Sequence, residues 1–135
     1  MPPRYLLDTN IVSYLLNGRM PLVRSKFDLV TAEAVAISSI SEAEVFYGLA
    51  LKPGTLRLRF AAEALFASVT CMAWDSEAAR NYGSLRVKQR QIGRPLSLED
   101  MMIAAHAIAA GLILVTHDAA FSFVEGLKTE DWTIQ

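Results

Sequence analysis

The stretch Tyr5-Leu6-Leu7-Asp8-Thr9-Asn10 decides how this chain folds. Three apolar residues end at a carboxylate and two small polar residues, a pattern typical of a buried strand that passes into a helix. Parallel α/β sheets bind their ligands outside the carboxyl ends of the strands, and Asp8 stands at such an end. We therefore expect Asp8 to lie in the functional site.

The rest of the chain alternates between short apolar runs and longer amphipathic segments. Further strands are predicted at 35–37, 69–74 and 112–115, and helices at 11–16, 21–30, 41–49, 55–67, 76–92 and 98–110. This alternation predicts a mostly parallel sheet of four to five strands with helices on both faces, the tail 121–132 being a candidate edge strand. The fold class is α/β, and we expect a single domain.

Composition narrows the kind of protein. With 53% hydrophobic residues, the 135-residue chain can bury a full core. Charges interrupt the apolar runs and the N-terminus lacks a signal-peptide pattern, so we expect no membrane segment. One cysteine, Cys71, excludes an internal disulfide and favours a cytoplasmic location. Because the net charge is −1, a nucleic-acid partner would have to be held by a local basic patch or by metal ions.

Three more acids, Glu44, Asp100 and Asp118, each stand at a predicted strand end or helix start. The fold logic directs them to the same edge of the sheet as Asp8. Carboxylates that meet there repel one another unless a cation neutralises them. Oxygen ligands without a Cys or His cluster favour Mg²⁺ or Mn²⁺, and such ions support phosphodiester hydrolysis.

Helix capping offers a second interpretation of the same acids. Ser41-x-x-Glu44 and Ser97-x-x-Asp100 both match a capping pattern, and Asp8 and Asp118 can each cap a turn or helix. The residues alone therefore leave a metal site and helix capping open as alternatives.

Five short segments of the sequence form a recognisable series, in both their order and their spacing. They are 6–10 (LLDTN), 40–48 (ISEAEVFYG), 93–107 (GRPLSLEDMMIAAHA), 114–121 (LVTHDAAF) and 126–132 (GLKTEDW). Together they resemble the PIN-domain ribonucleases, and within them the VapC toxins of bacterial type II toxin–antitoxin modules. The resemblance implies a PIN-like three-layer α/β/α sandwich, formed by a single PIN domain over residues 1–135.

The resemblance also implies a site for Mg²⁺- or Mn²⁺-dependent endoribonuclease chemistry. By similarity, Asp8, Asp100 and Asp118 hold the metal ion. Glu44 then completes the ligand set through a water or orients the attacking water as a general base. Thr9 and Thr116 are expected to hydrogen-bond these carboxylates and fix their orientation. Many members of the family have Asn where this chain has His117.

The implied substrate is RNA, with tRNA favoured and the anticodon region of initiator tRNA as one candidate. The densest basic stretch holds the candidate RNA contacts Arg86, Lys88 and Arg94, together with Arg90. The same charges also suit a solvated helix end, so both interpretations stand at this point.

The resemblance further implies a VapB-type antitoxin as partner, in a toxin–antitoxin hetero-oligomer, together with a homodimer of this chain. The apolar side of 11–16, with Phe46, Leu49 and Leu51, is one candidate surface for the antitoxin. The alternative is that these side chains only fill the core.

Three conspicuous ring side chains are assigned structural roles. His106 stands six positions beyond Asp100 and hence on a different helix face, so we expect it to be packed or hydrogen-bonded. Trp74 and Trp132 are expected in the core instead of acting as platforms for RNA bases.

Two other functions compete with the nuclease interpretation. One is an aspartyl phosphotransferase with Asp8 as nucleophile, but Asn10 stands where such enzymes have a second acid and no lysine follows the predicted strand that ends at Val115. The other is a non-catalytic PIN-like module that only binds RNA or protein. The presence of all four acids argues against that module.

Overall fold

A five-stranded parallel sheet forms the centre of the structure, a computed structural model that describes residues 2–135. The strands lie in the order β3-β2-β1-β4-β5, and every neighbouring pair is parallel. Their bounds are β1 Tyr5–Leu7, β2 Val35–Ser38, β3 Thr70–Met72, β4 Ile113–Val115 and β5 Thr129–Glu130. The expected parallel sheet is confirmed, and the C-terminal tail supplies its edge strand.

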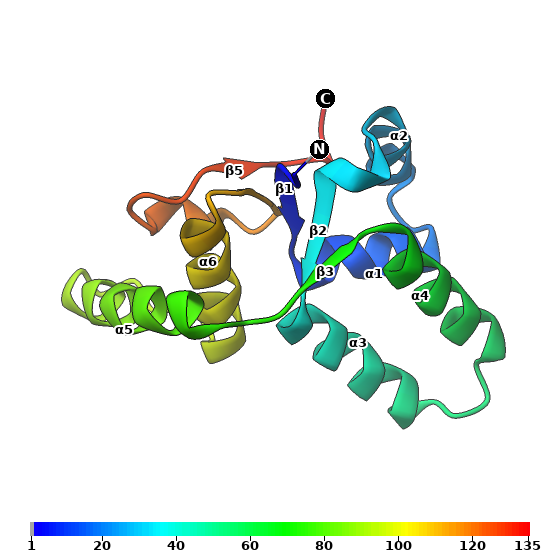
Figure 1. Cartoon of the computed structure of the whole chain (residues 1–135), viewed down its shortest axis with the longest axis horizontal. Helices are drawn as coiled ribbons and strands as arrows, with labels where there is room; N and C mark the ends of the chain where they lie inside the picture. The colour runs from blue at the N-terminus through cyan, green and yellow to red at the C-terminus, as the bar shows by residue number, and fades with distance from the viewer. Residues whose placement is uncertain (1) are drawn as a thin grey trace.

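Helices cover both faces of this sheet, which gives the three expected layers (Figure 1). One side carries α1 (Thr9–Asn17), α2 (Pro21–Leu29), α3 (Ser39–Leu51) and α4 (Leu56–Ser68). The other side carries α5 (Ser76–Gln91), α6 (Leu98–Ala110) and the short 3₁₀ helix η2 (Ala119–Phe123), while a second such turn, η1 (Ala32–Ala34), leads into β2. None of the helices within residues 2–135 is both long and apolar enough to cross a bilayer.

Strand β1 is apolar throughout because both of its faces are buried. Tyr5 and Leu7 pack into the core under α1 to α4, whereas Leu6 packs into the core under α5 and α6. The C-terminal segment closes the first of these cores with the buried Trp132, whose ring meets that of Tyr5 edge to face at 5.3 Å. A strand buried on both faces has no polar positions, which explains the uninterrupted apolar pattern.

The chain order makes the end of β1 the point where the strand order of the sheet reverses. Strand β1 pairs with β2 on one side and with β4 on the other, so the connections diverge at this point. The Asp8 amide donates to the Val115 carbonyl over 3.0 Å, which joins the ends of β1 and β4. Ligands of open α/β sheets bind where connections diverge in this way.

Helix α3 begins earlier than its sequence pattern predicts. The capping residue is Ser38, whose hydroxyl accepts from the Ile40 amide, and not Ser41. Glu44 therefore lies in the second turn of α3, too far along to cap it, and the predicted Ser41-x-x-Glu44 capping pattern is wrong. The free backbone amides of a helix are confined to its first turn, so capping gives no reason for an acid at Glu44.

Candidate active site

Asp8 is the most buried carboxylate of the site, with 4% of the residue exposed. One of its oxygens accepts from the Ile11 amide at 2.8 Å and caps α1, as the capping interpretation predicts. Burial raises the pKa of Asp8 to about 6; hydrogen bonds from Thr116 and Ile11 oppose that rise, and the charges of Asp100 and Asp118 add to it. Asp8 therefore caps a helix and is also in the electrostatic field of two other acids.

Asp100 and Asp118 approach Asp8 from the other half of the sheet. Asp100 lies in the first turn of α6, whose cap is Ser97 as predicted, and Asp118 caps η2 by accepting from the Ala120 amide at 2.9 Å. Burial raises the pKa of Asp100, a hydrogen bond with Ser97 lowers it, and the charges of Asp118 and Glu99 raise it further. The charges of Asp100 and Asp118 thus raise the pKa of Asp8, and the charge of Asp118 raises the pKa of Asp100.

Glu44 joins the site through hydroxyl groups. The Thr9 hydroxyl donates to a Glu44 carboxylate oxygen over 2.7 Å, and it lies 3.0 Å from the hydroxyl of the buried Ser41. Thr9 directly follows Asp8, so this bond ties α3 to the end of β1. Ser41 was not predicted as part of the site, although its position three residues before Glu44 places both on one face of the helix.

Thr116 provides the matching support for the aspartates. Its side chain is buried and hydrogen-bonds the Asp8 carboxylate, and its hydroxyl accepts from the Asp118 amide over 3.1 Å. One hydroxyl at the end of β4 thus fixes two of the acids relative to each other. The expected Thr9 hydrogen bond is the 2.7 Å contact with Glu44, and the Thr116 side chain acts on Asp8 by lowering its pKa.

The chemistry of these donors fits a divalent cation. Asp8, Asp100 and Asp118 bring three negative charges to one edge of the sheet, and none of the ion pairs within residues 2–135 neutralises them. In that part of the chain, no three acidic, histidine or cysteine side chains are close enough to form a complete metal ligand set as they stand. The charges of Asp100 and Asp118 nevertheless act on Asp8, and that of Asp118 acts on Asp100, so a cation held between these acids would need waters to complete its coordination, as is common for Mg²⁺.

A hydrogen-bonded cluster beside Asp118 was not predicted from the sequence. His117 Nδ1 lies 2.8 Å from an Asp131 oxygen and 2.9 Å from the Thr133 hydroxyl. Burial raises the pKa of Asp131, but hydrogen bonds from Thr133 and His117, together with the charge of His117, hold the pKa of Asp131 below its ordinary value. Asp131 follows the end of β5, so the rule that selected Asp8 applies to it as well.

His106 and Trp132 occupy buried structural positions, as expected, whereas Trp74 is only half-buried and lies outside both cores. His106 is buried, its Nδ1 lies 2.8 Å from the Ser38 hydroxyl, and burial lowers its pKa. Trp132 is buried, and the half-buried Trp74 donates its indole N–H to the Met102 carbonyl over 2.9 Å. The structure thus ties all three rings to the core or to the helix layers.

The predicted RNA contacts all lie on α5 or on the segment after it, and all are exposed. Lys88 is 3.8 Å from Glu125, and Arg94 stacks on the ring of Phe123 at 4.1 Å. Arg86 donates to the Tyr82 hydroxyl over 3.0 Å. These contacts separate the four cations into differently placed groups, and their role in RNA binding stays a prediction.

Comparison with known proteins identifies the family to which the chain belongs. The PIN domain model matches residues 5–127. A relative from Shigella flexneri called tRNA(fMet)-specific endonuclease VapC is 34% identical over 96% of this chain and 98% of its own length. The chain is a PIN-domain protein of the VapC family. Ribonuclease VapC2 of Haemophilus influenzae is 32% identical to this VapC-family chain, over 96% of it and 98% of that relative.

Solved structures confirm the fold of this VapC-family protein. DNA-bound VapBC from Salmonella typhimurium aligns with a TM-score of 0.89 at 29% identity, covering 96% of this chain and 98% of that one. VapBC2 from Rickettsia felis, bound to a DNA fragment from its promoter, aligns with a TM-score of 0.87 at 29% identity over 95% and 98%. The expected PIN-like sandwich is therefore confirmed over nearly the whole chain.

Proposed function

We propose that this chain is a metal-dependent endoribonuclease, the toxin of a toxin–antitoxin pair, that hydrolyses phosphodiester bonds in RNA. The observation that carries the proposal is the grouping of three aspartates at one edge of the sheet. Burial, together with the charges of Asp100 and Asp118, raises the pKa of Asp8 to about 6. Grouped carboxylates of this kind are costly for a fold and are typical of functional sites. The names of the VapC relatives support the same activity.

The residues of the site would have two roles, binding of the metal ion and transfer of a proton. Asp8, Asp100 and Asp118 would hold Mg²⁺ or Mn²⁺, which supplies positive charge for the phosphate and for the departing oxygen. The Ile11 amide and Thr116 hydroxyl keep the Asp8 carboxylate in place. The Thr9 hydroxyl holds one Glu44 oxygen, so that its other oxygen can accept the proton of the attacking water.

We propose tRNA as the substrate, and initiator tRNA as the first one to examine. Two relatives that match over nearly their full length carry the name tRNA(fMet)-specific endonuclease. Because tRNA resides in the cytoplasm, we place the activity of this chain there.

Cleavage should depend on both the metal and the aspartates. The purified chain is expected to cut initiator tRNA with Mg²⁺ or Mn²⁺ and to leave it intact in excess EDTA. Asp100→Asn should slow cleavage by about a thousandfold, because removing a ligand removes several kcal/mol of charge stabilisation. Gel analysis of end-labelled tRNA measures both effects.

The matched control for Asp100 is its exposed neighbour Glu99. Glu99→Gln removes the same charge one residue away and should leave cleavage within about threefold of the native rate. Equal cleavage by the native protein and by Asp100→Asn, or full cleavage in EDTA, would contradict the proposal.

We also propose a VapB-type antitoxin as partner, as in the VapBC assemblies of the relatives. The docking surface predicted from the sequence is partly wrong. Ile11, Leu15 and Leu49 are buried core residues, so the apolar side of α1 is not free to bind a partner. Exposed apolar side chains lie instead on α3 and α4: Phe46, Tyr47, Leu51, Leu56 and Phe60. Beside them, a groove of about 680 Å³ runs between α1 and α4.

An acid placed on α4 should weaken antitoxin binding. Phe60 is 70% exposed, so Phe60→Asp should leave the fold intact and weaken binding of the adjacent gene product by roughly thirtyfold, the effect of an interface anchor. Calorimetry of the purified pair measures the change. Leu29→Asp, on the exposed part of α2, is the matched control. Equal effects of both variants would exclude α4 as the docking surface.

A further inference from the structure

Helix α5 presents its cations on two different sides. Leu85 and Gln89 are buried and form the stripe that faces α6 and η2. Arg86 and Arg90, four residues apart, lie together on one flank of this stripe. Lys88 lies on the other flank, in a small cleft that Ile108 and Glu125 also line. Arg86 and Arg90 therefore lie on the opposite side of the helix from Lys88.

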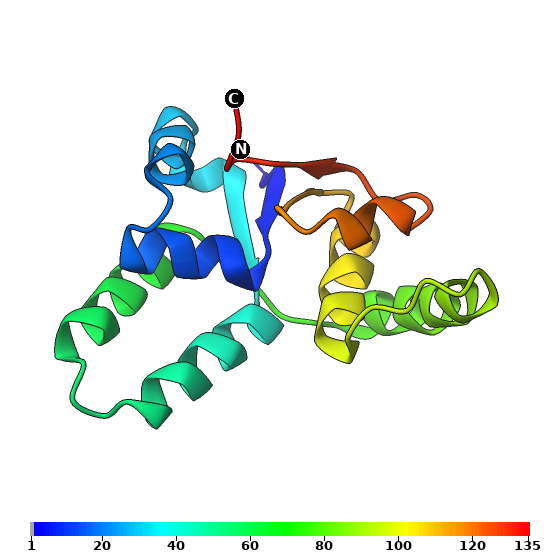
Figure 2. The same ribbon diagram turned by 180° about the vertical axis from the view of Figure 1, so that it is seen from behind.

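The flank with Arg86 and Arg90 borders a groove of about 430 Å³. Its opposite wall is the segment from Gly93 to Leu96 and the first turn of α6, with Leu98 and Met101. Figure 2 shows this linking segment running back along α5 to the beginning of α6. Leu98 and Met101 lie in the same first turn of α6 as Asp100, although Asp100 itself is not among the residues that line the groove.

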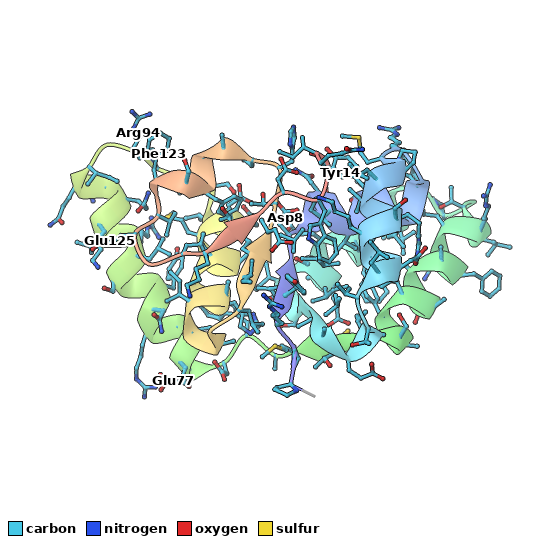
Figure 3. The ribbon with its side chains drawn as sticks, turned by 90° about the horizontal axis from the view of Figure 1, so that it is seen from above. Asp8, Tyr14, Glu77, Arg94, Phe123 and Glu125 are labelled. Atoms are coloured by element: carbon cyan, nitrogen blue, oxygen red, sulfur yellow. The ribbon has the colours of Figure 1, made fainter. Side chains whose placement is uncertain are left out.

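The other two cations make contacts outside this groove, although their chain neighbours Gln89, Gly93 and Pro95 line it. Arg94 lies over the Phe123 ring, and Lys88 pairs with Glu125. Figure 3 shows Arg94, Phe123 and Glu125 at the outer end of the molecule, away from Asp8 near its centre. Neither Lys88 nor Arg94 lines the groove.

Arg86 is held in position by a chain of contacts that ends on α6. Its guanidinium donates to the Tyr82 hydroxyl over 3.0 Å. The Tyr82 ring packs edge to face on Trp74 at 6.0 Å, and Trp74 is hydrogen-bonded to the Met102 carbonyl. A guanidinium that is fixed before binding loses less conformational entropy when it binds an anion.

We propose that this groove binds the phosphate backbone of the RNA strand beside the bond that is cut, with Arg86 and Arg90 as its phosphate ligands. The inference rests on the proposed function for the identity of the strand. Its own support is the pair of arginines on one wall, the absence of acidic residues among the groove-lining residues within 2–135, and a second wall formed by the same turn of α6 that carries Asp100. Arginine matches phosphate geometry with two parallel hydrogen bonds.

The test compares two double variants that remove equal charge. In an Asp8→Asn background without added metal, binding of initiator tRNA is measured by fluorescence anisotropy from about 50 to 300 mM NaCl. Arg86→Ala/Arg90→Ala should weaken binding roughly tenfold per arginine. It should also flatten the slope of log Kd against log salt by about 0.7 for each phosphate that is no longer neutralised. Lys88→Ala/Arg94→Ala, the control, should change the slope by much less.

Equal weakening of RNA binding in both double variants would contradict the proposed RNA site, because only the overall charge of the protein would then matter. Unchanged binding in both variants would contradict it as well. Tyr82→Phe should weaken binding about threefold alone and add nothing to Arg86→Ala. An equal effect of Tyr82→Phe in both backgrounds would contradict the positioning of Arg86 by Tyr82. Failure of the native protein to cut RNA would refute the proposed function, whereas the groove is decided by binding alone.

Discussion

Replacing Asp8 by Asn is expected to abolish RNA cleavage and, at the same time, to make the metal-free protein more stable. Asn keeps the side-chain oxygen that caps α1, because Asn and Asp are equally good capping residues. It removes the charge that burial and two other aspartates make costly. Cleavage should fall by at least about a thousandfold, the effect of removing a metal ligand.

The size and pH dependence of the stability gain follow from the pKa of Asp8. Its pKa lies near 6 in the folded chain against an ordinary value of 3.8. The folded state therefore holds this proton more tightly, and the free energy of unfolding falls as pH rises from about 4 to about 6. At pH 7.5 the charge costs as much as roughly 3 kcal/mol, from about 1.4 kcal/mol per pKa unit.

Thermal unfolding in EDTA at two pH values tests this prediction. Asp8→Asn should unfold at a clearly higher temperature than the native chain at pH 7.5, and the difference should nearly vanish at about pH 3, where Asp8 is protonated in the folded chain and mostly protonated in the unfolded chain. Glu63→Gln on the exposed side of α4 serves as the charge control. A lower unfolding temperature for Asp8→Asn at pH 7.5 would contradict the electrostatic description of the site.

Replacing Glu44 by Gln is expected to separate catalysis from metal binding. The charges that act on Asp8 are those of Asp100 and Asp118, and Glu44 is not among them. Its contact is the Thr9 hydroxyl, which suits a general base more than a direct metal ligand. Cleavage should fall by about a hundredfold to a thousandfold, the usual range for general-base catalysis.

Metal binding by the Glu44→Gln variant should persist. A cation at a hundred times its Kd adds about 2.7 kcal/mol to the free energy of unfolding, so the rise in unfolding temperature with Mg²⁺ measures retention directly. Glu42→Gln, two residues away on α3 and half-buried, is the matched control and should keep cleavage. Disappearance of the Mg²⁺-dependent rise in Glu44→Gln would make Glu44 a ligand and not the base.

Sequence patterns predicted most of the fold because they record what each segment buries. The run Tyr5–Leu7 is apolar because both faces of β1 are covered, and Gly111 follows α6 because the chain there needs a positive φ of 68°. Such signals are local. They failed at the start of α3, where Ser38 and Ser41 are equally good caps and only the pairing of β2 with β3 decides which one ends the strand.

The sequence by itself determined the α/β class, the order of the strands along the chain and the four acids that merit attention. Only the tertiary structure decided which of those acids affect one another, that Ile11 and Leu49 belong to the core, and that Arg86 and Lys88 face different grooves. The physical reason is that periodicity reports burial along one element, whereas the field at a carboxylate depends on distances between elements. Those distances are set by how the sheet and its helices pack.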